Sequence, residues 1–428
     1  MPALHAVLEL RCSACGEHAA PDAIACRSCG DLLAFVLQTD TVDPWAIDDQ
    51  ARVRRASTDA IDRSGVWRFR ELLPTVDRQK IVSLREGDVP LYSGHLCARY
   101  AGVERLELLH LGMNPTASFK DFGMTVAISD AHARGARVAV CASTGNTSAS
   151  MAAYAARAGM VAAVLVPDDA VSEAKLAQTL DYAAHVVAIA GDFDAALEVV
   201  RGLDPHVYAI VNSVNPFRIE GQKTIALVML ESRGWHAPDW IVLPGGNLGN
   251  ASAIGKGLRE AKALRLIDRL PKLAVVQAEG AAPFVRAFET GTDLVPVKAE
   301  TTATAIKIGA PASWRKALAE VRASHGLALR VTDAEIAEAR AVIGADGIGC
   351  EPASAASLAG LRRMREREQI GDGEEVVAIL TGHVLKDTAY AAAYHAGTGA
   401  RANHVRRVTS AEQARAALAE LAGTAPVG

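Results

Sequence analysis

Residues 137–167 read RVAVCASTGNTSASMAAYAARAGMVAAVLVP, and this stretch indicates the architecture of the chain. Apolar, β-rich residues fill 137–142 and again 160–167, and between them an Ala-rich segment with helical spacing, 147–159, ends on Gly159. Glycine is the residue that most readily adopts the left-handed backbone just after a helix. Strands that are apolar throughout are buried on both faces, and a helix between two of them lets them pair in parallel. The stretch therefore predicts one strand–helix–strand unit of a parallel α/β sheet.

The same alternation continues along the chain. A helical segment at 172–184 opens with Ser172, a residue type that commonly caps a helix N-terminus. Further β-rich runs occupy 185–190 and 207–212, and a second series occupies 240–245, 273–279 and 375–382. Two such series predict an α/β protein with two parallel-sheet lobes and a cleft between them. Outside the lobes, a polar stretch at about 38–80 predicts a linker with short helices, and an Ala-rich segment at 411–421 predicts a terminal surface helix.

The composition excludes two classes of partner. Of the 428 residues, 45 are Lys or Arg and 49 are Asp or Glu, a net charge of −4, so a broadly basic surface for nucleic acid is not expected. No apolar run approaches the roughly 18 residues of a membrane helix. The first residues lack the basic segment and long apolar stretch of a secretion signal. We therefore expect a soluble, cytoplasmic protein without a nucleic-acid or membrane partner.

Four of the seven cysteines are clustered near the N-terminus. They form a C-x2-C-x10-C-x2-C pattern, made of Cys12, Cys15, Cys26 and Cys29. In a protein without a secretion signal, such paired knuckles favour tetrahedral zinc over disulfides, and four thiolates complete a closed structural site. The alternatives are a ribbon that folds without metal and a ribbon that has lost its zinc.

Two loops at predicted strand ends have the composition of anion sites. CASTGNTSAS (141–150) places hydroxyls, a glycine and an asparagine before a helix, which suits a carboxylate or phosphate. Ordinary capping of that helix by Ser143 or Thr147 explains the loop equally well. LPGGNLGNASAIGKG (243–257) is glycine-rich where a strand meets a helix, which favours a phosphate cradle over a simple turn. Its spacing matches neither the dinucleotide nor the nucleoside-triphosphate pattern.

Three further segments are weak signals when each is taken alone. NPTASFKDFGM (114–124) places Lys120 at a helix start, where a lysine is most often a surface charge. VNSVNPFRIEGQKT (211–224) offers Arg218 as a fork-shaped phosphate donor, although a surface pair with Glu220 is the simpler interpretation. AILTGHVLKD (378–387) delivers Thr381 to the end of a buried strand, where it would also serve as a turn cap.

Taken together, the five segments resemble the threonine synthase family of fold-type II pyridoxal-phosphate (PLP) enzymes. NPTASFKD is similar to the family's NPTGSFKD, STGNTSAS and VNSVNPFRIEGQKT match nearly letter for letter, and GGNLGN fits GGNxGN. The resemblance runs from about residue 80 to 390, and the cysteine ribbon resembles the N-terminal extension of archaeal and actinobacterial-type members. It implies a tryptophan synthase β-like fold with PLP in the cleft. Within it we expect a zinc ribbon (1–37), a wrap that begins the large lobe (38–105), a small lobe (106–224) and a large lobe with C-terminal helices (225–428).

The resemblance also implies a role for each candidate residue. Lys120 would bind PLP covalently and shuttle protons at the substrate's Cα and Cβ. Around the cofactor, Asn146 would bind its 3′-oxygen and Thr381 its pyridine nitrogen. Its 5′-phosphate would lie on the loop Gly246, Asn247, Leu248, Gly249 and Asn250. The substrate α-carboxylate would meet Ser143, Thr144 and Thr147, and the substrate phosphate would meet Asn212, Ser213 and Arg218.

The implied reaction is γ-elimination of phosphate from O-phosphohomoserine followed by addition of water at Cβ, which yields L-threonine. The expected assembly is a homodimer. Ala310 and Val89 depart from the family pattern at positions expected near the substrate, so a related enzyme is the nearest alternative. It would be a cysteate-synthase-like enzyme using phosphoserine and sulfite, or a specialised-metabolism lyase acting on another phosphorylated amino acid. An alternative from another class is a non-catalytic protein whose ribbon binds a nucleic acid or a protein.

Overall fold

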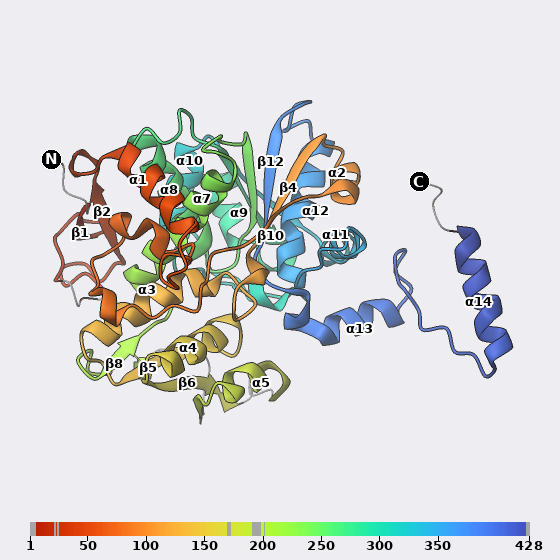
Figure 1. The fold of residues 1–428 in the computed structure, drawn as a ribbon, viewed down its shortest axis with the longest axis horizontal. Helices are drawn as coiled ribbons and strands as arrows, with labels where there is room; N and C mark the ends of the chain where they lie inside the picture. The colour runs from red at the N-terminus through yellow and green to blue at the C-terminus, as the bar shows by residue number, and fades with distance from the viewer. Residues whose placement is uncertain are drawn as a thin grey trace. The chain divides into compact units, whose positions relative to one another are not determined.

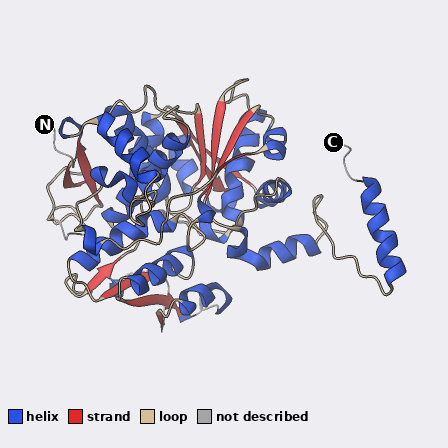
Figure 2. Ribbon diagram, in the orientation of Figure 1, coloured by secondary structure: helices blue, strands red, loops and turns tan. Residues whose placement is uncertain are grey.

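Three β-sheets form the frame of the first of two units in the computed structural model, Met1–Asp387. The structure describes residues 6–20, 23, 25–168, 173–190, 198–200 and 202–424. Figures 1 and 2 show the strands and the helices that surround them. In the described part of the chain, no helix combines the length and the apolar character that crossing a bilayer requires.

The largest sheet has six strands in the order β11-β10-β9-β12-β4-β3. Its strands are β3 (Leu91–Ser93), β4 (Arg105–His110), β9 (Trp240–Pro244), β10 (Lys272–Ala278), β11 (Leu327–Val331) and β12 (Glu375–Leu380). All neighbours pair in parallel except β3, which runs antiparallel to β4. The three predicted strands of the second series, β9, β10 and β12, are confirmed. The sequence analysis did not predict β3, β4 or β11.

The six-stranded sheet is buried on both faces, as its continuous apolar strands predict. Ile241 and Leu243 of β9 pack into the core that contains α3 (Lys120–Ala133), α7 (Pro216–Ser232), α8 (Gly249–Ala263) and α10 (Trp314–Ala323). Trp240 and Val242 alternate to the opposite face, beneath α2 (His95–Ala101), α11 (Asp333–Ala345) and α12 (Pro352–Glu366). A further helix, α9 (Pro283–Thr290), follows β10 in the chain. This burial explains why β9 shows no polar alternation.

The second sheet contains the opening stretch of the sequence analysis and confirms its interpretation. Its order is β7-β6-β5-β8, and every pair is parallel. The strands are β5 (Val138–Ala142), β6 (Val161–Pro167), β7 (His185–Ile189) and β8 (Tyr208–Ile210), with α4 (Asn146–Arg157) between β5 and β6. Gly159 follows α4 with φ +69°, the left-handed conformation expected there. The described helix α5 is Glu173–Asp181, and the predicted cap Ser172 lies outside the described residues.

Helices α3 and α7 cross at very short range, and this crossing joins two predicted site residues. A Cβ added to Gly221 of α7 would overlap the Phe122 carbonyl of α3, and one added to Gly123 would press on the Arg218 backbone. Only glycine permits such an approach of two backbones. The crossing therefore fixes Lys120, at the start of α3, relative to Arg218 on α7.

The N-terminal part forms a hairpin and a wrap. Strands β1 (Val7–Cys12) and β2 (Leu33–Gln38) pair antiparallel, with Cys12 opposite Leu33. The predicted linker contains α1 (Pro44–Arg55) and the short 3₁₀ helices η2 (Trp67–Leu72) and η3 (Arg78–Lys80). The division of the chain into four parts stays a prediction. It assigns residues from 106 onward to the small lobe, whereas β4, which contains residues 106–110, lies in the six-stranded sheet.

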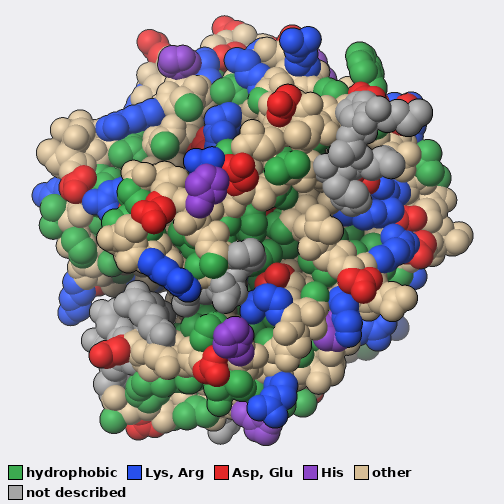
Figure 3. All heavy atoms as spheres, turned by 90° about the vertical axis from the view of Figure 1, so that its left-hand side faces the viewer, with side chains coloured by type: hydrophobic (Ala, Val, Ile, Leu, Met, Phe, Trp, Pro, Cys, Tyr) green, Lys and Arg blue, Asp and Glu red, His purple; other side chains and the backbone are tan. Residues whose placement is uncertain are grey.

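The second unit, Thr388–Gly428, contains α13 (Thr388–Ala396) and α14 (Ala411–Thr424). The predicted terminal helix at 411–421 is therefore confirmed. On the face of the molecule drawn in Figure 3, basic and acidic side chains are interspersed, as the nearly balanced composition suggests.

Candidate active site

Lys120 stands where the two sheets meet. It is the first residue of α3, and just before it Phe119 donates its backbone N–H to the Thr381 carbonyl at 2.9 Å, at the end of β12. The Lys120 Nζ lies 3.9 Å from the centre of the Phe119 ring. Burial, followed by the positive charge of Arg218, lowers the pKa of Lys120 to about 7, and the Glu351 carboxylate offsets part of this effect. A lysine in this environment is substantially neutral near pH 7 and is therefore nucleophilic.

Asp121, the neighbour of Lys120, anchors the loop before α3. Its buried carboxylate accepts hydrogen bonds from the Thr116 backbone N–H at 2.8 Å, the Thr116 hydroxyl, and the Ser150 hydroxyl at 2.6 Å. Burial raises the pKa of Asp121 to about 6. Because Ser150 belongs to α4, Asp121 ties the Lys120 loop to the helix that follows the STGN loop. The position of Asp121 directly after Lys120 in SFKD is the feature of the sequence that could have indicated this anchoring role.

The STGN loop leaves the N-terminus of α4 without a side-chain cap. Gly145 is the N-cap residue, and no side chain bonds the first N–H groups of the helix. The Ser143 hydroxyl accepts only the Gly145 N–H, at 3.3 Å. Ser143, Thr144 and Thr147 are all partly buried. Since the helix is not capped by these hydroxyls, the structure favours the anion-site interpretation of the loop over the capping interpretation.

Glu351 connects the two predicted cofactor contacts and was missed by the sequence analysis. Its buried carboxylate accepts a hydrogen bond from the Asn146 amide at 3.1 Å and one from the Thr381 hydroxyl at 3.3 Å. Thr381 is also held by the Ser354 hydroxyl, 2.9 Å away. Burial raises the pKa of Glu351. Glu351 lies in the segment GCEPASAASLAGL (349–361), and only the tertiary structure reveals what it touches.

The loop Gly246–Asn250 has the features of a phosphate cradle. Strand β9 ends at Pro244, Leu248 adopts a left-handed conformation with φ 64°, and α8 begins at Gly249. A Cβ on Gly246 would lie 3.2 Å from the Ala305 carbonyl oxygen, so the backbone there is closely enclosed. Both polar atoms of the buried Asn250 amide, and the buried Ser313 hydroxyl, have no hydrogen-bond partner among the described residues.

These buried polar groups fit an anionic ligand. Unsatisfied buried donors are rare in native proteins, and backbone N–H groups at a helix N-terminus attract phosphate. Asn247 itself is engaged: its side-chain amide donates to the Ser213 hydroxyl, and its amide oxygen Oδ1 accepts the Ala312 N–H at 2.6 Å. The structure thereby brings the predicted cofactor loop and the predicted substrate-phosphate segment together.

Arg218 is buried on the first turns of α7 and faces that segment. One guanidinium nitrogen, Nη1, donates to the Val211 carbonyl at 3.0 Å, while the buried Nε has no partner among the described residues. Burial lowers the pKa of Arg218 to about 10. The interpretation of a surface pair with Glu220 is wrong, because both residues are buried and Glu220 pairs instead with lysines of α7 and α8.

Asn212 has a structural role that the sequence did not reveal. Its amide both donates to and accepts from the Ala142 backbone, at 3.3 Å each. Because Ala142 ends β5 and Asn212 follows β8, the side chain ties two strand ends of the second sheet together. A contact of Asn212 with substrate phosphate stays a prediction.

The four cysteines of the ribbon converge. Their sulfur atoms all lie within 4.8 Å of one another, with Cys12 and Cys29 Sγ 3.4 Å apart and Cys15 and Cys26 Sγ 3.6 Å apart. Four sulfurs about 2.3 Å from a tetrahedral zinc are separated by about 3.8 Å, so the set fits this ion. Hydrogen bonds from the backbone of Cys15 and Ala14 lower the pKa of Cys12 to about 6, which favours the thiolate that zinc binds.

We expect the purified protein to contain about one zinc per chain, bound by these thiolates. Metal analysis should show this, and thiol modification should release the metal. Cys97, Cys141 and Cys350 serve as an internal control, because burial raises the pKa of each and keeps it unreactive. Zinc-free protein in which the four ribbon thiols react at once would refute the metal site, whereas the assignment of the enzyme site rests on other residues.

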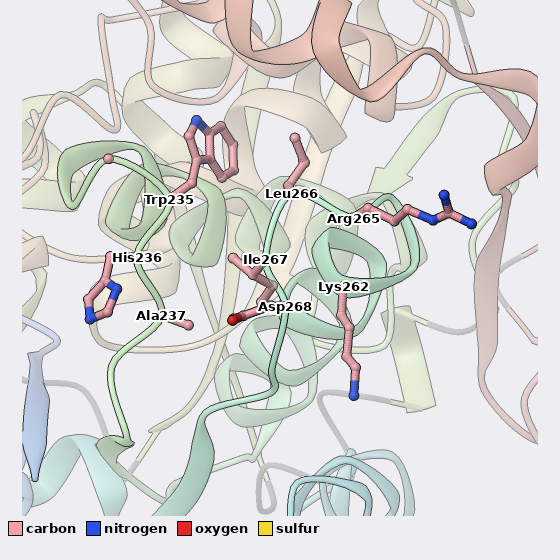
Figure 4. A pocket seen from close by; sticks show the side chains of 9 residues that line it. Trp235, His236, Ala237, Lys262, Arg265, Leu266, Ile267 and Asp268 are labelled. Atoms are coloured by element: carbon pink, nitrogen blue, oxygen red, sulfur yellow. The ribbon is translucent and has the colours of Figure 1, made fainter.

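The surface hollow shown in Figure 4 is a separate feature. It encloses about 580 Å³ and is lined by the last turn of α8 and by the turns that follow α7 and α8, with Trp235, His236, Lys262, Arg265 and Asp268 among its residues. None of the predicted site residues lines it. The chemistry therefore concentrates at the strand ends described above.

Comparisons with known proteins show the family of this chain. Residues 82–382 match the family described as pyridoxal-phosphate dependent enzyme, and residues 9–33 match a zinc-ribbon domain. The chain is 44% identical to a threonine synthase of Methanocaldococcus jannaschii over 88% of its own length and 92% of the relative's. It is 48% identical to a threonine synthase of Synechocystis sp. over 74% and 82%. A solved threonine deaminase of Solanum lycopersicum has the same fold, with a TM-score of 0.61 and 19% identity over 74% of this chain and 89% of that one.

Proposed function

Because the chain belongs to the threonine synthase family of pyridoxal-phosphate dependent enzymes, we propose that it converts O-phospho-L-homoserine and water to L-threonine and phosphate. The observation that carries this proposal is a second phosphate-binding environment. The buried Arg218, whose Nε has no partner in the described part of the chain, lies beside a segment that Ser213 joins to the separate cofactor loop through Asn247. A buried, fork-shaped donor of this kind suits a substrate that carries a phosphate.

The cofactor of the family, pyridoxal 5′-phosphate, supplies an electron sink for negative charge that develops on the substrate carbons. We assign its covalent attachment to Lys120 and its phosphate to the loop 246–250. Asn146 and Thr381, which both donate to the Glu351 carboxylate, would hold its ring. A neutral threonine hydroxyl at the ring nitrogen, in place of a carboxylate, moderates the withdrawal of electrons.

In the proposed reaction, Lys120 moves protons, and the remaining side chains orient the substrate. The neutral Lys120 amine accepts a proton from Cα and then from Cβ, for which its lowered pKa suits it. Cleavage of the Cγ–O bond releases phosphate with the bonding electron pair, and Arg218 stabilises the developing charge. The uncapped N-terminus of α4, with Ser143, Thr144 and Thr147, would hold the α-carboxylate. Lys120 releases each proton before it accepts the next. Cγ gains a proton to become the methyl group, water adds its hydroxyl to Cβ, and a proton returns to Cα, so that the three protons given up by Cα, Cβ and water end on Cγ, Cα and the released phosphate.

Oxygen-18 water tests this reaction. Elimination breaks the Cγ–O bond, so the released phosphate should contain no oxygen from the solvent, whereas the threonine hydroxyl should contain one. Mass spectrometry of both products measures this. Homoserine together with labelled phosphate would reveal simple phosphate-ester hydrolysis and would contradict the proposal.

The lowered pKa of Lys120 predicts how the apoprotein takes up its cofactor. The neutral amine is the reactive form, so the rate of PLP binding should rise with pH up to about 7 and level off above it. Stopped-flow absorbance between pH 5.5 and 9.5 measures the profile. A rate that keeps climbing to pH 9.5 would show that the amine has an ordinary lysine pKa.

Two finer features of the proposal rest on the family resemblance. We propose that the enzyme is a homodimer and that it works in the cytoplasm. Sedimentation of the purified holoenzyme measures the first, and a monomer at micromolar concentration would contradict it.

A further inference from the structure

The ribbon contacts the enzyme body at two buried points. On β2, the Phe35 ring packs edge-on against the Phe217 ring of α7, with centroids 5.0 Å apart and an interplanar angle of 69°. Two residues earlier, the carbonyl of the fully buried Leu33 accepts a hydrogen bond from Lys316 Nζ of α10 at 2.6 Å. Both contacts come from the strand that follows the last cysteine knuckle.

Each contact point lies next to one of the two predicted phosphate sites. Phe217 immediately precedes Arg218 in α7. Lys316 lies one turn after Ala312 and Ser313, whose backbone N–H groups bond Asn247 of the cofactor loop at 2.6 and 3.3 Å. A shift of either helix start would therefore move a phosphate-binding group directly.

A buried charge cluster connects α7 and α8 behind these points. Lys223 Nζ pairs with Glu220 at 2.6 Å and with Glu260 at 2.8 Å, and Lys256 pairs with the same two carboxylates. Because buried ion pairs hold their geometry tightly and are costly to break, α7 and α8 should move together. A displacement at Phe217 would then reach both Arg218 and the loop that begins α8.

We expect the ribbon to need a bound metal for full order. The segment that matches a zinc ribbon, 9–33, is too short to bury a core of its own, and metal binding supplies the folding energy of such units. Across the hairpin, the predicted metal ligand Cys12 pairs with Leu33, and the Leu33 carbonyl accepts the hydrogen bond from Lys316. A metal that fixes Cys12 should therefore also fix the backbone of β2 at Leu33 and Phe35.

We propose that the metal-loaded ribbon braces both phosphate sites, with Phe35 and Lys316 as positioning residues for Arg218 and for the cofactor loop. Loss of the metal or of either contact loosens the binding of substrate phosphate and of PLP more than it slows the chemistry at Lys120. The substrate part of this inference rests on the proposed function, whereas the PLP part requires only membership of the family.

The test compares Phe35→Ala and Lys316→Met with wild type as zinc-loaded holoenzyme. We expect each variant to raise the KM for O-phosphohomoserine by about fivefold or more, with kcat changed by less than about threefold. The dissociation constant of PLP, measured by absorbance titration of the apoprotein, should also rise by about threefold or more. Phe35→Tyr, which keeps the ring, should restore both constants. Removing the metal from wild type with a chelator should reproduce the Phe35→Ala values.

The control is Val36→Ala, the next residue of β2, whose side chain is 42% exposed. It should leave all constants at wild-type values. Metal content is measured for each protein, so that loss of zinc is separated from loss of the contact. Wild-type constants for PLP and substrate in both Phe35→Ala and Lys316→Met would overturn the inference, as would equal effects in Val36→Ala. If wild type does not turn over O-phosphohomoserine, the proposed function fails, and the PLP constants still decide whether the ribbon braces the cofactor loop.

Discussion

Replacing Lys120 with alanine is expected to abolish turnover, lowering kcat by at least about a thousandfold. The substitution removes both the covalent attachment of the cofactor and the group that moves protons at Cα and Cβ. Steady-state assay of phosphate release measures the loss. In wild type, borohydride reduction and peptide mapping should place the cofactor on residues 114–124.

Lys298→Ala is the matched control, because the side chain of Lys298 is 90% exposed and pairs only loosely with Glu300, at 3.9 Å. It should retain full activity and full cofactor absorbance. A reduced cofactor on any peptide other than 114–124, or an active Lys120→Ala protein, would refute the assignment.

Arg218→Lys is expected to lower kcat/KM for O-phosphohomoserine by at least about tenfold, equivalent to about 1.4 kcal/mol. Lysine keeps the charge but loses the planar fork that binds two phosphate oxygens at once, and this site is buried, where such bonds contribute most. The visible absorbance of bound PLP should stay normal, because the cofactor phosphate is assigned to the separate 246–250 loop. An Arg218→Lys enzyme with unchanged kcat/KM would exclude a bidentate phosphate contact.

A second variant at this position tests the electrostatic link between Arg218 and Lys120. The positive charge of Arg218 helps to lower the pKa of Lys120. Arg218→Met removes that charge, so the pKa of Lys120 should rise, and the pH at which PLP uptake levels off should rise with it. Arg218→Lys retains the charge and should leave this profile in place, which separates the loss of charge from the loss of geometry.

The strands that the sequence predicted are those with continuous apolar runs. β9 and β12 read as largely hydrophobic because both of their faces are covered by helices. β4 carries Arg105 and Glu107, so it has no continuous apolar run and was not recognised as a strand. Its pairing with β12 stabilises the extended conformation. β11 is an edge strand that contains the charged Arg330, so it lacks the continuous apolar run of the strands that were predicted.

The candidate site likewise contains features that the sequence predicted and contacts that only the fold creates. The cysteine spacing predicted a converging set because the geometry of each knuckle is local. The glycine-rich loop and the STGN loop were recognisable because a strand end and a helix start determine their backbone. Glu351, in contrast, acquires its role only when α12 brings it to Asn146 and Thr381, which are 205 residues before it and 30 after it. The amide of Asn212 likewise joins Ala142, 70 residues away.

The central claim is tested most directly by giving the wild-type holoenzyme two substrates side by side. O-phosphohomoserine and O-phosphoserine are each supplied with and without sulfite, and phosphate and amino-acid products are measured together. We expect O-phosphohomoserine to yield phosphate and L-threonine in equal amounts, independently of sulfite, and O-phosphoserine to react far more slowly. Faster turnover of O-phosphoserine with sulfite, giving cysteate, would contradict the proposed reaction and identify a replacement enzyme built on the same site.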